Sequence, residues 1–185
     1  MKVWHEISGI FPKIPCMEYY HTTEGYMKTV DNVLRHSIVA PSKEDAEDLF
    51  VYAKNSLLST NSWKHYSHAT NTSFELTNNN GYVLHRHAHT GDNIRISIPG
   101  GAVYQLHIDS IIYDDYPDAD TESITMYLNP VSGAEINHDS IFCTLAIERA
   151  GTHLVSVCTG VEEIPALSAD QLNNLITGFI EFEEK

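Results

Sequence analysis

The sequence of residues 91–101 is GDNIRISIPGG, and its alternation of apolar and polar residues recurs along much of the chain. Isoleucine recurs at every second position from Ile94 to Ile98, with one polar residue between each pair. Successive side chains of a strand point to opposite faces, so this period of two is typical of a β-strand with one buried face. Pro99-Gly100-Gly101 then predicts a turn, because proline fixes φ and glycine readily adopts positive φ. The stretch is therefore predicted to be a strand that ends in a tight connection.

The same period of two extends to both sides of this stretch, from Thr72 to about Glu163. The other alternating segments are Phe74–Leu76, Tyr82–Leu84, Leu106–Ile108, Ile124–Leu128, Ile141–Ile147 and Leu154–Val157. They are separated by turn residues, among them Asn80-Gly81, Tyr116-Pro117-Asp118 and Ala150-Gly151-Thr152. Alternating segments with short connections predict an antiparallel sheet of about six or seven strands over residues 72–163.

A helical pattern precedes the alternating segments. Ser42 can cap the start of a helix, and Glu44 and Asp45 would follow in the first turn, near the positive end of the helix dipole. Apolar residues then recur at spacings of three and four, at Ala46, Leu49, Phe50, Ala53, Leu57 and Leu58. This pattern predicts an amphipathic helix over residues 43–58, within a helical stretch of residues 42–66.

A second helix is predicted at the end of the chain, over residues 168–183. Ser168-Ala169-Asp170-Gln171 matches the capping box, and an apolar stripe follows at Leu172, Leu175, Ile176, Phe179 and Ile180. We therefore predict a single α+β domain over residues 1–185. In it, a curved or barrel-like antiparallel sheet is packed by the amphipathic helix before it and by the C-terminal helix, and residues 1–41 are an irregular segment.

Composition narrows the partners and the compartment. The 185 residues include 11 Lys+Arg and 25 Asp+Glu, which gives a formal net charge of −14. So acidic a surface repels phosphates, and no run of about 18 apolar residues occurs, so neither nucleic acid nor a membrane is predicted as a partner. Three scattered cysteines and the lack of a signal-peptide pattern favour a cytoplasmic protein.

Two segments resemble a group of uncharacterised bacterial proteins. Gly91–Gly100 is similar to a G-D-x-I-R-I-x-I-P-G segment of that group, and the run LAIERAG at 145–151, leading into Leu154–Val157, is also similar to it. The likeness covers residues 70–160 or so. It implies a β-rich domain in a bacterial protein, and it implies nothing about catalysis because no activity is established for the group.

Three histidines stand two residues apart, at His85, His87 and His89. On a strand they would line one face about 6.5 to 7 Å apart, where neighbours could share a metal ion with His107 or Asp92 as a further ligand. The alternative is a polar row on the solvent face of an edge strand. We favour the alternative, so no cofactor is predicted.

Six acidic residues surround the turn at Pro117: Asp109, Asp114, Asp115, Asp118, Asp120 and Glu122. Ca²⁺ needs several oxygen ligands within one loop, but the spacing does not match D-x-D-x-D-G and no glycine supplies the sharp bend. A solvated hairpin loop is the better interpretation.

Three functional hypotheses follow, and the first is a binding or accessory module without catalytic activity. Nucleotide-loop and nucleophile-elbow signatures are missing, and Cys143 has the parity of a core residue. The second is a helix-grip carrier of a small apolar ligand, although aromatic residues also serve simply to fill a core. Its pocket walls would be Trp63, Tyr66, Phe74, Tyr82, Phe179 and Phe182. The third is a metal-dependent enzyme that uses His85, His87 and His89. The partner is then a protein or a small apolar ligand, and the oligomeric state is not predicted.

Overall fold

The structure is a computed structural model that describes residues 33–67, 72–131, 143–160 and 167–181. Contacts divide the chain into two units, residues 1–31 and residues 32–185, and all described residues belong to the second. The single domain over residues 1–185 stays a prediction.

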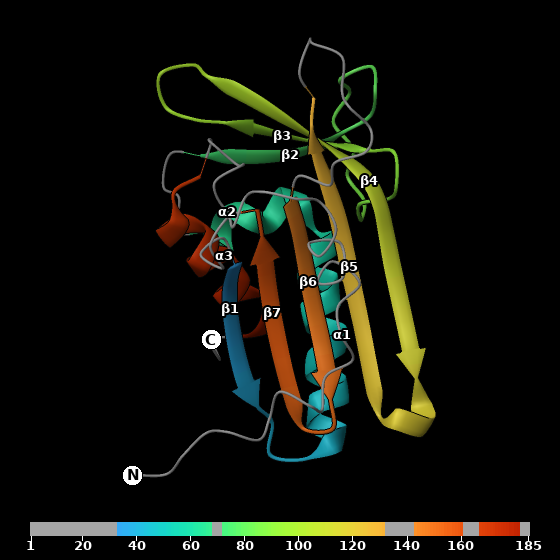
Figure 1. Cartoon of the computed structure of the whole chain (residues 1–185). Helices are drawn as coiled ribbons and strands as arrows, with labels where there is room; N and C mark the ends of the chain where they lie inside the picture. Colours follow the sequence, from blue (N-terminus) through green and yellow to red (C-terminus); the bar gives the residue numbers. More distant parts are fainter. Residues whose placement is uncertain (1–32, 68–71, 132–142, 161–166, 182–185) are drawn as a thin grey trace, which may run out of the picture. The chain divides into compact units, whose positions relative to one another are not determined.

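The described residues form helices and strands in the order that Figure 1 shows. They are β1 (Val33–Val39), α1 (Lys43–Leu58), the 3-10 helix η2 (Thr60–Ser62), α2 (Trp63–Tyr66), β2 (Ser73–Thr77), β3 (Asn93–Ser97), β4 (Val103–Tyr116), the 3-10 helix η3 (Pro117–Ala119), β5 (Thr121–Pro130), β6 (Cys143–Ala150), β7 (His153–Thr159) and α3 (Ala169–Ile180). The predicted turns after residues 98, 116 and 150 each lie between two strands, so these three predictions are confirmed.

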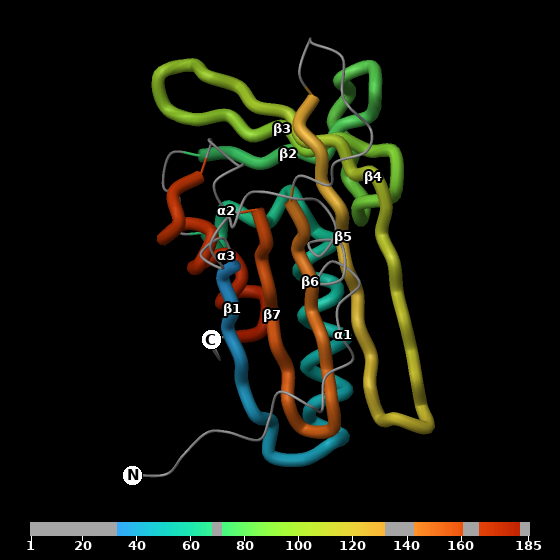
Figure 2. Tube along the Cα trace, in the orientation of Figure 1, coloured from blue at the N-terminus to red at the C-terminus, as the bar shows by residue number. Residues whose placement is uncertain are grey.

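All seven described strands form one antiparallel sheet, in the order β1-β7-β6-β5-β4-β3-β2. The sheet is not closed, since its order ends at β1 on one side and at β2 on the other. Figure 2 shows how β1, near the start of the described chain, lies beside β7, near its end. The predicted α+β class, with an antiparallel sheet of about six or seven strands and a C-terminal helix, is confirmed.

The first strand corrects the sequence prediction. Residues 1–41 were predicted to be irregular, yet Val33–Val39 form β1 and pair with β7 from Val33↔Thr159 to Val39↔His153. The helix predicted to precede the sheet therefore follows its first strand. The partner of β1 lies more than a hundred residues away along the chain, and the centre of β1 is the polar run Arg35-His36-Ser37. Local periodicity therefore did not reveal this strand.

Both predicted helices are present, with the predicted caps. Ser42 Oγ accepts a hydrogen bond from the backbone N–H of Asp45 at 3.1 Å, and α1 spans Lys43–Leu58. Ser168 and Gln171 form both bonds of the capping box, and α3 ends at Ile180 within the described chain. Both helices pack against β7, α1 also against β6, and α3 also against β1 and α1. The main core therefore lies between one face of the sheet and these two helices.

Candidate functional site

Four of the predicted pocket residues form one aromatic cluster in this core. The ring centre of Trp63 lies 5.9 Å from that of Phe74 and 5.8 Å from that of Phe179, and the ring centre of Tyr66 lies 5.9 Å from that of Phe179. The exposed fractions of Trp63, Phe74 and Phe179 are 2%, 3% and 0%. The rings therefore pack on one another where the carrier hypothesis expects an apolar ligand.

A glycine shows how closely α3 approaches α2 at this cluster. A Cβ atom built on Gly178 would lie 2.7 Å from the Cβ atom of Tyr66, closer than real Cβ contacts allow. Tyr82, another of the residues predicted to line the pocket, is 71% exposed on the connection between β2 and β3 and does not join the cluster. Phe182 lies outside the described residues.

The histidine row lies on a loop, so the predicted strand through it is wrong. Of the segment Tyr82–Leu84, only Val83 makes a bridge, to Thr77, and residues 84–92 form neither helix nor strand. The side chains of His85, His87 and His89 are exposed. Within the ranges that the structure describes, no three His, Cys, Asp or Glu side chains are placed to hold a metal ion.

Hydrogen bonds that do not belong to a strand ladder hold this loop. Arg86 donates to both carboxylate oxygens of Asp92, at 2.6 and 2.9 Å, and the backbone N–H of His89 donates to Asp92 at 2.9 Å. Burial by itself raises the pKa of Asp92, but these hydrogen bonds outweigh it and hold the pKa below its usual range. Ala88 is buried and donates its N–H to Leu58 O at the end of α1. The loop is therefore pinned at its centre and at its end.

The two further metal ligands considered for the row have other partners. Asp92 binds Arg86, and His107 Nδ1 lies 2.9 Å from Asn93 Oδ1 on β3.

Cys143 and Cys158 are free and buried, and their contact together with burial raises the pKa of the Cys143 thiol. The prediction that Cys143 is a core residue is confirmed.

The acidic run does not form a loop of its own. Asp109, Asp114 and Asp115 lie on β4, Asp118 on η3, and Glu122 on β5. Two members bind one buried cation: Arg149, whose side chain is 5% exposed, donates to Asp120 at 2.9 Å and to Glu122 at 2.7 Å. These two ion pairs fasten the β4–β5 turn to β6.

Among the strands that the structure describes, the second half of β4 has a neighbour on one side only. β3 pairs with β4 from Val103 to His107, whereas β5 pairs with it as far as Tyr116. The register shifts between Ile108 and Ser110, which leaves Asp109 as an extra residue in a bulge. Residues 109–116, which we call the open edge, therefore have no described strand on the β3 side, as Figure 1 shows.

The main chain of the open edge presents hydrogen-bonding groups to that side. The backbone N–H of Ile111 donates to Thr90 Oγ1 at 3.1 Å, and Thr90 belongs to the loop before β3. Alternate residues of an antiparallel strand direct their backbone groups to the same side. Tyr113 and Asp115 must then direct their N–H and C=O groups away from β5 as well. No described backbone group pairs with them there.

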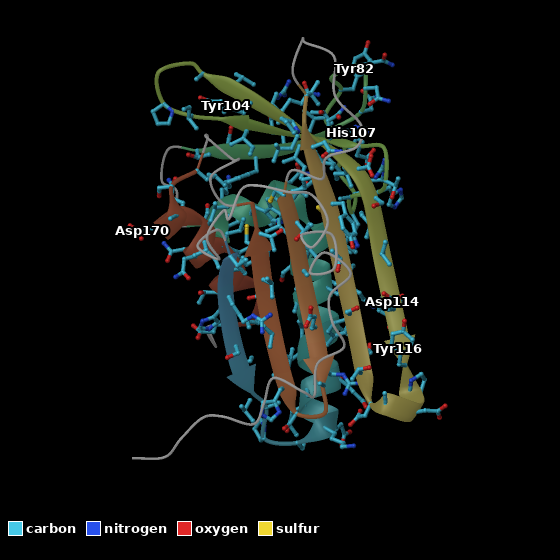
Figure 3. The ribbon with its side chains drawn as sticks, in the orientation of Figure 1. Tyr82, Tyr104, His107, Asp114, Tyr116 and Asp170 are labelled. Carbon is cyan, nitrogen blue, oxygen red and sulfur yellow. The ribbon has the colours of Figure 1, made fainter. Side chains whose placement is uncertain are left out.

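Exposed apolar side chains follow the same segment. The exposed fractions of Ile112, Tyr113 and Tyr116 are 43%, 47% and 54%. Asp114 and Tyr116, both labelled in Figure 3, lie on the outer margin of the sheet along β4. An exposed strand edge with large apolar residues is a template for pairing with another chain.

Tyr113 is fixed in place on the helix side of this edge. Its ring centre lies 6.4 Å from that of Phe50 on α1 and 4.7 Å from Lys54 Nζ. Its hydroxyl donates to Glu122 Oε2 at 3.0 Å, and burial together with this bond raises the pKa of Tyr113 to about 12. The phenol is therefore neutral near pH 7, which suits a contact surface better than a proton acceptor.

Sequence reasoning found the acidic residues and missed the edge. The alternating pattern was recognised only at Leu106–Ile108, although Ile111-Ile112-Tyr113 are three strand-forming residues in a row and indicate that the same strand continues to the turn at Pro117. The lack of a neighbour on one side is a tertiary feature that periodicity does not contain.

Comparison with models of known protein families and with curated proteins finds no match for this chain. Of the described helices, none has both the length and the apolar character needed to cross a membrane.

Proposed function

We propose that this chain is a binding module without catalytic activity, and that it recruits a partner protein by adding a strand of that partner to the open edge of β4. One observation carries the proposal: of the strands in the described part of the chain, only β5 pairs with residues 110–116, and the open edge exposes main-chain groups together with Ile112, Tyr113 and Tyr116. In strand addition, main-chain hydrogen bonds supply affinity and alternate side chains supply specificity.

The charges on the edge favour a different protein over a second copy of this chain. Asp109, Asp114 and Asp115 have no ion-pair partner within 4 Å among the described residues. Two such edges brought together would set like charges close to one another, which is a common device against edge-to-edge association. Resemblance to a bacterial group and two free buried thiols support a bacterial, cytoplasmic setting as part of this proposal.

The other two hypotheses have less support. The sheet order and the packing of α3 suit a helix-grip carrier, but Trp63, Phe74 and Phe179 fill the expected ligand position with one another. A metal-dependent enzyme would need the histidine row, and His85, His87 and His89 lie exposed on a loop. Neither hypothesis uses the open edge.

A proline substitution on the open edge tests whether strand addition occurs there. Asp115→Pro removes one N–H that points away from β5 and keeps the hydrogen bonds between β4 and β5. Proline is tolerated at such a position because its missing N–H faces the open side of an edge strand. Asp115→Ala is the matched control, because it removes the same carboxylate and keeps the N–H. Hexapeptides selected from a random library on the full wild-type chain are measured by calorimetry on both variants, after circular dichroism has shown that both fold.

We expect the selected peptides to bind Asp115→Pro at least tenfold more weakly than Asp115→Ala. Equal affinities for the two folded variants, or a library that yields no binding peptide, would overturn the proposal.

A further inference from the structure

The open edge carries the same chemistry on both faces of the sheet, and this gives a rule for its partner. On the helix side, Tyr113 contacts Phe50, and Ile111 and Asp115 share its parity. On the opposite side lie Ile112, Asp114 and Tyr116. Each face therefore offers an apolar residue and one carboxylate, and the two carboxylates are adjacent in the chain.

No described ion pair joins Lys54, on α1, to either of these carboxylates. Lys54 lies over the rings of Phe50 and Tyr113, and its described contacts are with these rings. The formal charge of the whole chain is −14. A strand added to this edge therefore enters a negative field at two neighbouring positions, one on each face.

The loop before β3 limits where the added strand can lie. Gly91 N–H donates to Ile108 O, Ile108 N–H donates to Asp92 O, and Thr90 Oγ1 accepts from Ile111. These bonds close the edge up to Ile111 N–H. The added strand can then pair from Ile111 to Tyr116, a length of about six residues.

We propose that the partner is a basic extended segment in which two adjacent Lys or Arg residues precede an apolar run, and that it adds antiparallel to β4. This inference rests on the proposed function and names its partner. All strand pairs of the described sheet are antiparallel, and antiparallel pairing is slightly more stable per residue than parallel pairing.

The register follows from this direction. An antiparallel strand meets Tyr116 first, then Asp115 and Asp114, and last the apolar run from Tyr113 to Ile111. Its two basic residues are adjacent, so they project to opposite faces and each meets one carboxylate across the strands. Two basic residues separated by one position would both project to the same face and could meet only one carboxylate.

Four acetylated and amidated hexapeptides test the inference on the full chain. The paired peptide is Val-Lys-Arg-Thr-Val-Val, and the spaced peptide is Lys-Val-Arg-Thr-Val-Val, with the same composition. The reversed peptide is Val-Val-Thr-Arg-Lys-Val, and the neutral peptide is Val-Gln-Gln-Thr-Val-Val. Affinities are measured by calorimetry in 0.1 M and 0.5 M NaCl.

We expect the paired peptide to bind about tenfold more tightly than the neutral one, since two cross-strand ion pairs contribute about threefold each. The spaced and reversed peptides should each lose at least threefold against the paired peptide. The advantage over the neutral peptide should shrink in 0.5 M NaCl, because salt screens exposed charges.

Two double variants identify the carboxylates. Asp114→Asn with Asp115→Asn should bring the affinities of the paired and neutral peptides within threefold of each other. The control, Asp48→Asn with Asp170→Asn, removes two exposed acids from α1 and α3 and should preserve the tenfold difference. Asp48 stands two residues before Phe50 and therefore lies on another face of α1 than the residues that contact β4, and Figure 3 shows Asp170 far from Asp114.

The outcomes separate this inference from the proposed function. If the neutral peptide binds as tightly as the paired one, and both are lost in Asp115→Pro, the module stands and the basic partner is wrong. Equal affinity of the spaced and paired peptides would also overturn the inference. If no peptide binds at the edge, both proposals fail.

Discussion

The two halves of β4 lie on one continuous strand and have different surroundings. Val103–His107 pairs with β3, and Leu106 and His107 pair with β5 as well, whereas residues 110–116 pair with β5 alone among the described strands. The difference originates in the loop before β3. If β3 continued backwards in its present register, His89 would stand opposite Ile111 and His85 opposite Asp115, since Asn93 pairs with His107.

That continuation is the strand that the histidine row predicted. Instead, the Arg86–Asp92 pair and the buried Ala88 hold the loop away from β4. The open edge therefore exists because a loop is anchored, and the same anchor is a place where the difference between the two halves can be tested.

The largest expected effect comes from the cation that fastens the open half. Arg149→Met leaves Glu122 and Asp120 without their buried partner, and we expect a loss of about 3 kcal/mol in the free energy of unfolding, at the lower end for a broken buried pair. Urea unfolding measures it. Arg95→Met is the control, since the Arg95–Glu75 pair joins β3 to β2 with side chains 35% and 38% exposed. Its loss should stay under about 1 kcal/mol. Equal losses would mean that Arg149 contributes no more than a surface pair.

The second effect concerns the loop anchor. Asp92→Ala removes two charge-assisted bonds from Arg86 and one from the N–H of His89, and we expect it to cost about 2 kcal/mol of unfolding free energy. Asp92→Asn keeps the shape and part of the hydrogen bonding, so it should cost less. If the anchor holds the loop away from β4, amide exchange of residues 84–91 should rise in the alanine variant, and unchanged exchange would contradict this role.

The third effect is the pH dependence of that anchor. The folded-state pKa of Asp92 is lowered, so the folded protein binds fewer protons than the unfolded chain as pH falls through about 4. The stability that Asp92 contributes is complete above the unfolded pKa and is lost as pH falls toward the folded pKa. The stability difference between wild type and Asp92→Asn, measured in urea from pH 7 to pH 3, should therefore shrink below pH 4. A difference that is constant over this range would contradict the ionised pair.

Most of the fold could be predicted from local chemistry. Ser42 and the capping box at Ser168 marked the starts of two helices, and proline or glycine marked the ends of β3, β4 and β6. These signals are local because each depends on a few neighbouring backbone groups. β1 and the histidine loop could not be predicted, because one depends on a distant partner strand and the other on contacts with Leu58 and Asp92.

The sequence predicted the charged residues of the candidate site but not the strand edge on which they lie. The carboxylates of Asp114 and Asp115 were recognised as an acidic group, since charge is a property of the residue itself. Their role depends on which side of β4 has a neighbour, and that depends on where the chain from Arg86 to Asp92 turns. Of the aromatic residues named for a pocket, Trp63, Tyr66, Phe74 and Phe179 lie together, whereas the position of Tyr82 on a turn after Asn78 leaves it exposed.

A smaller effect is expected where the two halves of β4 meet. Thr90→Val removes the hydroxyl that accepts the N–H of Ile111, and we expect it to cost about 0.5 to 1 kcal/mol, the net value of one exposed hydrogen bond. Amide exchange of Ile111 should become faster, while exchange of Ile108, which pairs with Asp92, should not change. Thr90→Ser keeps the acceptor and serves as the control; equal exchange at Ile111 in both variants would show that the hydroxyl is not its partner.

The smallest effect on stability is expected on the open half itself, where a change in association should appear instead. Asp114→Asn with Asp115→Asn changes exposed or half-exposed side chains that have no ion pair among the described residues, so the free energy of unfolding should stay within about 0.5 kcal/mol. If these carboxylates keep two copies apart, the double variant should form dimers in sedimentation velocity, because like charges no longer oppose edge-to-edge pairing. The variant with Asp48→Asn and Asp170→Asn loses the same charge elsewhere and should stay as associated as the wild type. A second double variant, Asp114→Asn with Asp115→Pro, should not form this dimer, because the proline removes an outward N–H that strand pairing needs. A dimer that persists with the proline would place the association on another surface.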